Sequence, residues 1–307
     1  MGTVASTPTE PLPKAIVKPI DVKYEASVKN FVEQRHRVVI VSINYPKTSC
    51  PLKGCINDGI AMRDFLVRRV GNKPLELIFL RDNVDPSSRL YPTHENIMRA
   101  LKWAYSSASA ADFEAAPRSS QNFKAGNEPG TVVTFYYSGH GSYQKDRNGD
   151  ETDGWDETLC PVTPSGNFDE MIVDDELRSV VGPLITPNNY SLFLTDCCHS
   201  GTVFDLGYSF NGNRFIKRGK YVDAPSPVIH LGACYDHQTA QEGNVDGVRR
   251  GYFTHSLITA LKGNARYDIR TLYNIICNSM VKYVTAREEM PQLAAGSALS
   301  AQTRVPI

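Results

Sequence analysis

Two short segments of the sequence carry the residue types of nucleophilic catalysis. A pair of cysteines lies in Thr195-Asp196-Cys197-Cys198-His199-Ser200-Gly201, and a histidine lies 58 residues before Cys198 in Ser138-Gly139-His140-Gly141. A thiol near its ordinary pKa is only partly ionised at neutral pH, so a catalytic cysteine needs a neighbouring base and partial exposure. The sequence therefore indicates a cysteine nucleophile with a histidine base, although single cysteines are more often buried small hydrophobes.

Both segments follow extended, strand-like runs. Thr131–Tyr137 precedes the histidine and Tyr190–Leu194 precedes the cysteines. If these strands are adjacent and parallel, both turns emerge at the same edge of the sheet, where open α/β sheets build their sites. The spacing alone does not establish that adjacency.

Alternatives stay open among the reactive residues. On chemical grounds either Cys197 or Cys198 is the nucleophile. His199 is a rival base, but it adjoins the nucleophile in sequence and its side chain is expected to diverge, so His140 is preferred. The backbone N–H of Gly141 is accessible, and together with the N–H of the nucleophile it could stabilise an oxyanion.

The rest of the chain alternates strands and helices. Apolar runs predict strands at 38–43, 75–80, 131–137, 190–194 and 228–231, and amphipathic stretches predict helices at 57–70, 93–105, 252–261 and 272–283. The helix at 93–105 is predicted to begin at a capping threonine, Thr93. Strands separated by helices indicate an α/β fold with a mostly parallel central sheet. Residues 106–129 have little hydrophobic periodicity and are interpreted as a surface insertion.

Composition excludes several classes of protein. Lys+Arg and Asp+Glu are equal at 33 each, so no global field draws the chain to nucleic acid or an anionic membrane. The seven cysteines are an odd number without paired spacing, which favours a reducing compartment. There is no apolar run of membrane-spanning length and no secretory pattern, so a cytoplasmic protein is expected.

The N-terminal segment is expected to be an extended or disordered arm over residues 1–20, because it contains four prolines and little apolar periodicity. Met1-Gly2-Thr3-Val4-Ala5-Ser6 also fits the pattern for myristoylation of Gly2. The alternative is a disordered leader without a lipid.

Tyr137-Ser138-Gly139-His140-Gly141 and Asp196-Cys197-Cys198-His199-Ser200-Gly201 resemble the motifs of metacaspases, within the caspase-like cysteine peptidases. The resemblance runs from about Arg37 to the C-terminus and includes Leu52-Lys53-Gly54-Cys55-Ile56-Asn57-Asp58, Ile172-Val173-Asp174-Asp175-Glu176, Cys234-Tyr235-Asp236-His237-Gln238-Thr239-Ala240 and Pro291-Gln292-Leu293. Two features depart from the family: Gly232-Ala233-Cys234 replaces its usual Ser-Gly-Cys, and the insertion at 106–129 is unfamiliar.

The resemblance implies a caspase-hemoglobinase fold, an α/β/α sandwich packed as one domain, with a p20-like region at 21–206, a linker at 207–225 and a p10-like region at 226–307. It implies a type I-like core without a prodomain, and a monomer. In the family motif the nucleophile directly precedes His-Ser-Gly. The resemblance therefore assigns the role of nucleophile to Cys198 and the role of base to His140. Cys197 is then a neighbour whose side chain points elsewhere.

Asp58 and Asp196 are the acidic residues nearest the two turns. A carboxylate pair at the bottom of a cleft would bind a substrate Arg or Lys through charge-assisted hydrogen bonds, whereas the alternative is that Asp58 caps the following helix. The resemblance implies that Cys55, Asp58, Ser138 and Asp196 shape the S1 pocket. Peptides or proteins with a basic P1 residue are therefore the predicted substrates.

Acidic residues are dense between 146 and 157 and recur at 174–175. Oxygen ligands of this kind suit Ca²⁺, although the glycine is misplaced for an EF-hand and an acidic loop is usually just solvated. The resemblance implies that an activating calcium is held by Asp156, Asp174, Asp175 and Asp205.

The predicted linker is polar and basic at Arg214, Lys217, Arg218 and Lys220, which is typical of an exposed loop. An enzyme that cuts after Arg or Lys would find cleavable bonds there, so autoprocessing after Lys217, Arg218 or Lys220 is a hypothesis.

The sequence thus predicts a calcium-activated, Arg/Lys-specific cysteine endopeptidase. The alternative is a catalytically quiet caspase-like scaffold that acts by binding partner proteins. Intact Cys198, His140, Asp58 and Asp196 favour the enzyme, because a scaffold has no physical need for all four. Other peptidases of the same fold, paracaspase-like or legumain-like, are a third possibility.

Overall fold

The computed structural model of this protein describes residues 35–306 apart from 116–122, 125, 127, 150, 152–153, 219–220 and 263–265. The expected N-terminal arm, the candidate myristoylation site at Gly2 and the candidate processing site at Lys220 lie outside the described residues. No described helix combines the length and the apolar character needed to cross a membrane.

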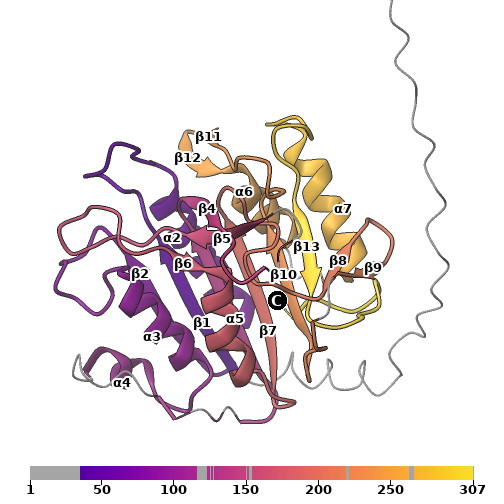
Figure 1. Ribbon diagram of the computed structural model, residues 1–307, viewed down its shortest axis with the longest axis horizontal. Coiled ribbons are helices and arrows are strands. Elements are labelled where there is room, and N and C mark those ends of the chain that lie inside the picture. The colour runs from indigo at the N-terminus through magenta and orange to yellow at the C-terminus, as the bar shows by residue number, and fades with distance from the viewer. Residues whose placement is uncertain are drawn as a thin grey trace, which may run out of the picture.

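A mixed eight-stranded sheet forms the centre of the described part of the molecule (Figure 1). Its strands, in spatial order, are β2 (Leu75–Arg81), β1 (Arg35–Ser42), β3 (Thr131–Ser138), β7 (Asn189–Asp196), β10 (Val228–Gly232), β13 (Gln292–Ala295), β8 (Tyr208–Phe210) and β9 (Phe215–Lys217). The pairs from β2 to β10 are parallel, and those from β10 to β9 are antiparallel.

Seven helices and two small sheets surround this centre in the described residues. The helices are α2 (Cys55–Val70), α3 (His94–Ala104), α4 (Ala110–Ala115), α5 (Asp174–Val181), the 3-10 turn η1 (Gly182–Leu184), α6 (Tyr252–Ala260) and α7 (Ile269–Met280). One small sheet contains β4 (Gly141–Lys145), β5 (Trp155–Leu159) and β6 (Ile172–Val173), and the other pairs β11 (Glu242–Val245) with β12 (Val248–Gly251).

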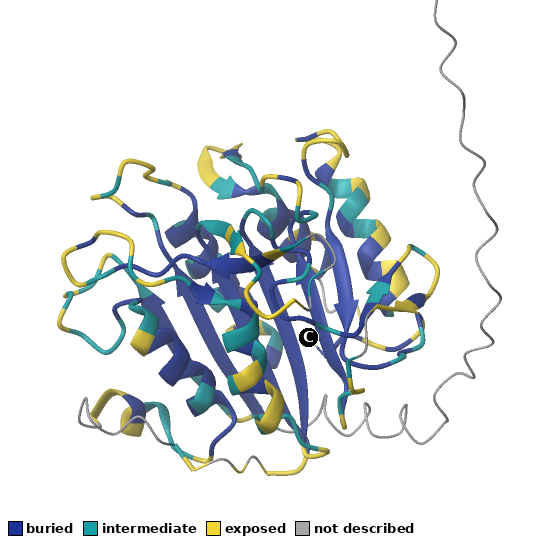
Figure 2. Ribbon diagram, in the orientation of Figure 1, coloured by how far each residue is buried: buried dark blue, intermediate teal, exposed yellow. Residues whose placement is uncertain are grey.

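Both faces of the central sheet are covered, because each strand directs alternate apolar side chains to two separate cores. In β1, Val38 and Ile40 enter the core formed with α2, α6 and α7, whereas Val39 and Val41 enter the core formed with α3 and α5. Figure 2 shows the buried strands between helices whose outer surfaces are exposed. The predicted α/β/α sandwich with a largely parallel sheet is confirmed.

Local signals set several helix ends. Thr93 is the predicted N-cap of α3, and its Oγ1 accepts a hydrogen bond from the Asn96 N–H at 3.2 Å. Asp268 caps α7 in the same way through the Thr271 N–H at 2.8 Å. The prediction for Thr93 is confirmed.

The predicted exposed linker is wrong in one respect, since it contains strands β8 and β9. Tyr208, Phe210 and Phe215 are buried, and the Phe210 ring packs edge-on against Tyr273 of α7. Strands of three residues are too short to display a period of two, and β8 exists because its backbone pairs with β13.

The predicted surface insertion contains the short helix α4. Phe113 of α4 is fully buried, and the Arg99 guanidinium lies 4.3 Å from the centre of its ring. One aromatic side chain therefore anchors the first part of this insertion to α3.

Candidate active site

The register of β3 and β7 brings the two sequence motifs together. The strands are parallel, and Ser138 lies opposite Asp196. His140 and Cys198 each follow two residues later, so both emerge at the carboxyl edge of the same two neighbouring strands. The predicted adjacency of these strands is confirmed.

The turns after β3 and β7 are in direct contact at Gly141. A Cβ atom at Gly141 would lie 1.9 Å from the carbonyl oxygen of Cys198 and 3.2 Å from the Sγ of Cys197. Real Cβ atoms do not approach other atoms as closely as the first of these distances. Only glycine therefore fits between the histidine turn and the cysteine turn.

His140 is oriented by two hydrogen bonds. Its Nε2 lies 2.6 Å from the Cys50 carbonyl oxygen, and its backbone N–H donates to the Tyr45 hydroxyl at 2.9 Å. A carbonyl oxygen can only accept, so Nε2 carries the hydrogen and Nδ1 is the basic nitrogen of the neutral ring. Sequence reasoning missed Cys50, because a backbone carbonyl leaves no residue-type signal.

Cys198 is half-buried, and burial raises the pKa of its thiol. Its Sγ lies 3.9 Å from the Ala240 carbonyl oxygen. Among the described residues, no hydrogen bond joins this sulfur to His140. The thiol must therefore rotate away from Ala240 to meet the imidazole, in keeping with the long catalytic contacts common in ligand-free sites.

The rival residues are held in other contacts. Cys197 is buried in the core on the α3 and α5 face, and burial raises its pKa well above the ordinary value. His199 has a left-handed backbone with φ of 52°, and its Nδ1 is hydrogen-bonded to the Asp236 carbonyl oxygen. These placements favour Cys198 as nucleophile and His140 as base, and the roles themselves stay predictions.

Asp58 and Asp196 lie near enough for their charges to interact, and each accepts a hydrogen bond from a backbone N–H group. Asp58 Oδ2 accepts from the Gly251 N–H at 2.8 Å, and Asp196 Oδ2 accepts from the N–H and hydroxyl of Thr254 at 3.0 and 2.6 Å. The alternative that Asp58 caps the helix is wrong, because α2 has Gly54 at its N-cap without a side-chain cap bond.

Burial dominates the electrostatics of this carboxyl pair. It raises the pKa of Asp58 well above its usual range, assisted by the Asp196 charge, and raises the pKa of Asp196 to about 6. Asp58 Oδ1 has no hydrogen-bond partner among the described residues. A bound cationic group would stabilise the ionised forms of Asp58 and Asp196, and it would donate a hydrogen bond to the unpartnered Asp58 Oδ1.

The other two predicted S1 residues lie beside this pair. Ser138 and Cys55 are buried. Burial raises the pKa of Cys55, and the nearby Asp58 and Asp196 charges add to the rise. The structure thus brings all four predicted S1 residues together.

Sequence reasoning missed Glu242, which lies near the Asp58 and Asp196 carboxyl groups. Its Oε2 accepts from the Gly54 N–H at 2.6 Å, and its Oε1 lies 3.0 Å from Arg249 Nε. Its charge contributes to the raised pKa values of Asp58 and Asp196. The only available signal was its position two residues after the Cys234–Ala240 motif.

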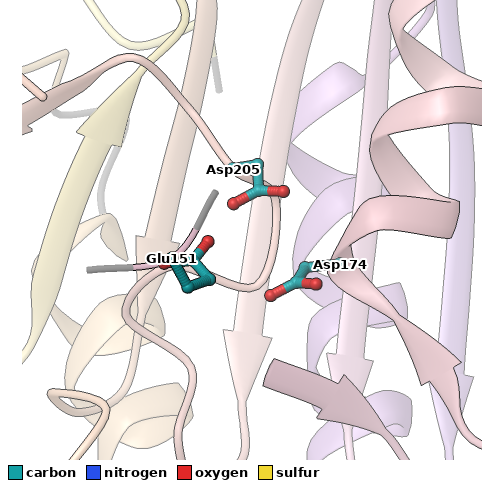
Figure 3. Close-up of side chains that lie close together, drawn as sticks. All are labelled: Glu151, Asp174 and Asp205. Atoms are coloured by element: carbon teal, nitrogen blue, oxygen red, sulfur yellow. The ribbon is translucent and has the colours of Figure 1, made fainter. Parts of the chain in front are cut away.

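The predicted calcium ligands form two carboxylate groups that share Asp174. One group contains Glu151, Asp174 and Asp205, and the other contains Asp156, Asp174 and Asp175, with ligand atoms within 4.8 Å of one another in each. Figure 3 shows the first three side chains directed toward one another from separate segments. Glu151 belongs to the predicted acidic segment but was not singled out as a ligand.

Carboxylate oxygens make up the whole donor set, which suits a hard cation such as Ca²⁺. Asp174 is buried, and burial raises its pKa to about 8 although it accepts a hydrogen bond from the Glu157 N–H at 2.7 Å. These residues fit a divalent cation, because a bound ion would offset the repulsion between their charges.

The candidate processing sites that the structure describes lie at the edge of the sheet. Lys217 is exposed in β9 opposite Tyr208, and its Nζ lies 3.4 Å from Asp223. The Arg218 N–H donates to the Gly207 carbonyl at 2.7 Å. The backbone of both residues is therefore paired with the segment at 207–208.

Comparison with known proteins agrees with this architecture. The model of the caspase domain matches residues 35–300. The chain belongs to the caspase domain family. It is 34% identical over 265 residues to metacaspase-1 and 31% identical over 259 residues to metacaspase-3, both of Arabidopsis thaliana, with 80% of this chain covered in each case. The resemblance to caspase-like cysteine peptidases, and among them to metacaspases, is confirmed.

The chain spans less than two thirds of these relatives, 64% and 65% of their lengths. Among solved structures, a protein of Geobacter sulfurreducens has the same fold with a TM-score of 0.59 at 19% identity. That match covers 88% of this chain and 97% of the other. The caspase fold predicted from sequence is confirmed.

Proposed function

We propose that this protein is a calcium-activated cysteine endopeptidase that cleaves peptide bonds after Arg or Lys. The observation that carries the proposal is the register of β3 and β7, which aligns Ser138 with Asp196 and leads to His140 and Cys198 at one sheet edge. A nucleophile, a base and an acidic pocket thus converge at one place, as caspase family membership leads us to expect.

In the acylation step, Nδ1 of His140 takes the proton from the Cys198 thiol, and the thiolate attacks the substrate carbonyl carbon. The electron pair of the carbonyl moves to oxygen, where the N–H groups of Gly141 and Cys198 donate to the oxyanion. The C–N bond then breaks, and the imidazolium returns the proton to the departing amine. The Cys50 carbonyl keeps the ring in the required tautomer throughout.

In the deacylation step, His140 takes a proton from water and the resulting hydroxide attacks the thioester carbon. The C–S bond breaks, the carboxylic acid product leaves, and the thiolate regains the proton from the imidazolium. No further reactant is needed.

Specificity is proposed to come from Asp58 and Asp196. The raised pKa of Asp196 still leaves it mostly ionised at neutral pH, and the unpartnered Asp58 Oδ1 offers a second acceptor. A guanidinium or ammonium group satisfies both, whereas an acidic P1 side chain would meet like charges.

Calcium is proposed to bind Asp156, Asp174, Asp175 and Asp205, with Glu151 beside them. Bound calcium would neutralise this cluster. Asp205 lies seven residues after Cys198, so its position is linked through a short segment to the nucleophile turn.

Autoprocessing is proposed after Lys217, Arg218 or Lys220, the basic residues nearest the end of β9. Wild-type protein incubated with Ca²⁺ should yield two fragments, and the Cys198→Ala variant should stay intact. Lys217→Gln, Arg218→Gln and Lys220→Gln, made separately, identify the bond, because only the substitution at the cleaved residue should prevent fragmentation. Absence of fragments while peptides are being cleaved would contradict autoprocessing.

The deciding experiment is turnover of fluorogenic peptides with Arg, Lys or Asp at P1, with and without Ca²⁺. We expect cleavage after Arg and Lys that requires Cys198 and increases with Ca²⁺. Cleavage after Asp would overturn the S1 assignment, and activity that survives Cys198→Ala would overturn the nucleophile. A folded protein that cleaves none of these peptides would favour the scaffold alternative.

A further inference from the structure

Two exposed aromatic side chains lie near the turn that carries the candidate nucleophile, and neither has a role in the proposed reaction. Tyr143 in β4 is 51% exposed and Trp155 in β5 is 44% exposed, the highest values for any Phe, Tyr or Trp side chain that the structure describes. Their ring centroids are 5.0 Å apart at an interplanar angle of 76°. Contiguous exposed apolar surface of this kind marks interaction sites more often than single exposed residues do.

The direction of Tyr143 follows from Gly141. Alternate residues of a strand share a face, so Gly141 and Tyr143 are on the same face of β4. Because a Cβ at Gly141 would meet the Cys198 carbonyl, this face points toward the nucleophile turn. The Tyr143 ring accordingly lies edge-on to His199, with ring centroids 4.9 Å apart.

His199 completes a fixed aromatic surface. Its left-handed backbone and its bond from Nδ1 to the Asp236 carbonyl hold the imidazole against Tyr143. We call Tyr143, Trp155 and His199 the aromatic shelf. The shelf begins at the residue directly after Cys198 and extends along the β4–β5 hairpin. This hairpin crosses in front of the upper part of the central strands in Figure 1.

The aromatic shelf and the acidic pocket lie on opposite sides of the nucleophile. Asp58 and Asp196 bind backbone groups of β12 and α6, and α6 packs on the α2 side of the central sheet. The β4–β6 sheet contacts α5, on the other side. The departing amine takes its proton from His140, so the residues after the scissile bond lie on the His140 side of the nucleophile, where β4 begins at the next residue.

We propose that the aromatic shelf binds an apolar or aromatic side chain within the first two residues after the scissile bond. This inference rests on the proposed peptidase function and adds a second specificity site to it. Aromatic rings favour edge-to-face and offset contacts with other rings, and the two exposed rings supply such faces. Tyr143 is the central residue, since it touches both other members.

The first test uses internally quenched peptides with Arg at P1 and either Phe-Gly or Gly-Gly after the scissile bond. Wild type should show a kcat/KM about fivefold higher for the Phe peptide. Tyr143→Ser should lower kcat/KM about fivefold more for the Phe-Gly peptide than for the Gly-Gly peptide, so that the ratio falls to about one, and Tyr143→Phe should retain the ratio. Tyr283→Ser, at an exposed tyrosine on another segment, is the matched control and should leave both rates unchanged.

The outcomes separate the two proposals. If neither peptide is cleaved by folded protein, the peptidase function fails. If both are cleaved at equal rates, or if Tyr143→Ser keeps the preference for Phe, the aromatic shelf fails and the peptidase function stands.

A second test does not depend on turnover. The chain has two tryptophans, and Trp103 is fully buried, so the solvent-exposed component of the emission comes from Trp155. In Cys198→Ala, titration with the uncut Phe-Gly peptide should give a saturable blue shift of that emission, and the Gly-Gly peptide should not. An unchanged spectrum while fluorescence anisotropy shows that the peptide is bound would overturn the inference.

Discussion

Ser138 and Asp196 are register partners in the parallel strands β3 and β7. This last register pair contributes two of the four candidate S1 residues, and the candidate base and nucleophile follow two residues later, in the turns beyond the two strands. The pairing of the two strands therefore fixes the starting points of the two turns that carry His140 and Cys198. The predictions below follow from this arrangement.

Gly141→Ala should abolish activity, because the added methyl would clash with the Cys198 carbonyl oxygen and displace the backbone N–H groups that are the candidate oxyanion donors. We expect kcat to fall by at least about 100-fold, measured with a P1-Arg peptide. Gly182→Ala is the matched control, since Gly182 has helical backbone angles and no atom within 4 Å of an added Cβ. Full activity in Gly141→Ala would contradict the close contact of the two turns.

Cys197→Ala and Cys198→Ala should separate packing from catalysis. Cys197 is buried in the core, so its truncation should lower the free energy of unfolding by about 1 kcal/mol and leave turnover within a fewfold of wild type. Cys198→Ala should lose turnover without loss of stability. Denaturant unfolding and peptide kinetics on both variants check this, and the reverse pattern would assign the nucleophile to Cys197.

Selectivity for a positively charged P1 should depend on pH through Asp196. Its pKa of about 6 means that it is ionised above pH 6 and becomes neutral below it. The ratio of kcat/KM for P1 Arg to that for P1 citrulline, a neutral isostere, should therefore fall as the pH drops below 6, approaching about tenfold per pH unit. The ratio cancels the titration of the candidate cysteine and histidine, which both substrates share. A ratio that stays constant from pH 5 to 8 would remove Asp196 from recognition of the charge.

Asp174→Asn should weaken calcium binding more than any other single substitution in the acidic cluster, because Asp174 belongs to both carboxylate groups. We expect the Ca²⁺ concentration for half-maximal thermal stabilisation to rise at least about tenfold, measured in the Cys198→Ala background to prevent self-cleavage. Asp85→Asn, at an exposed acid outside the cluster, is the control. An unchanged calcium midpoint in Asp174→Asn would place the cation elsewhere.

The sequence by itself determined the central strands and the residues that end them. The apolar runs before Ser138 and before Asp196 predict buried strands, and the reactive residues follow those runs directly. The N-cap at Thr93 could also be predicted, because a capping side chain acts within three residues of its own position. Apolar runs and capping residues depend on the types of neighbouring side chains, and these can be read directly from the sequence.

Only the tertiary structure decided the contacts between distant backbone groups. The Cys50 carbonyl that orients His140, the Gly251 N–H that holds Asp58 and the pairing of β8 with β13 all use main-chain atoms. Every residue type carries these atoms, so they leave no trace in the sequence. The contact of Tyr143 with His199 was likewise hidden, because it depends on how the β4–β5 hairpin lies against the nucleophile turn.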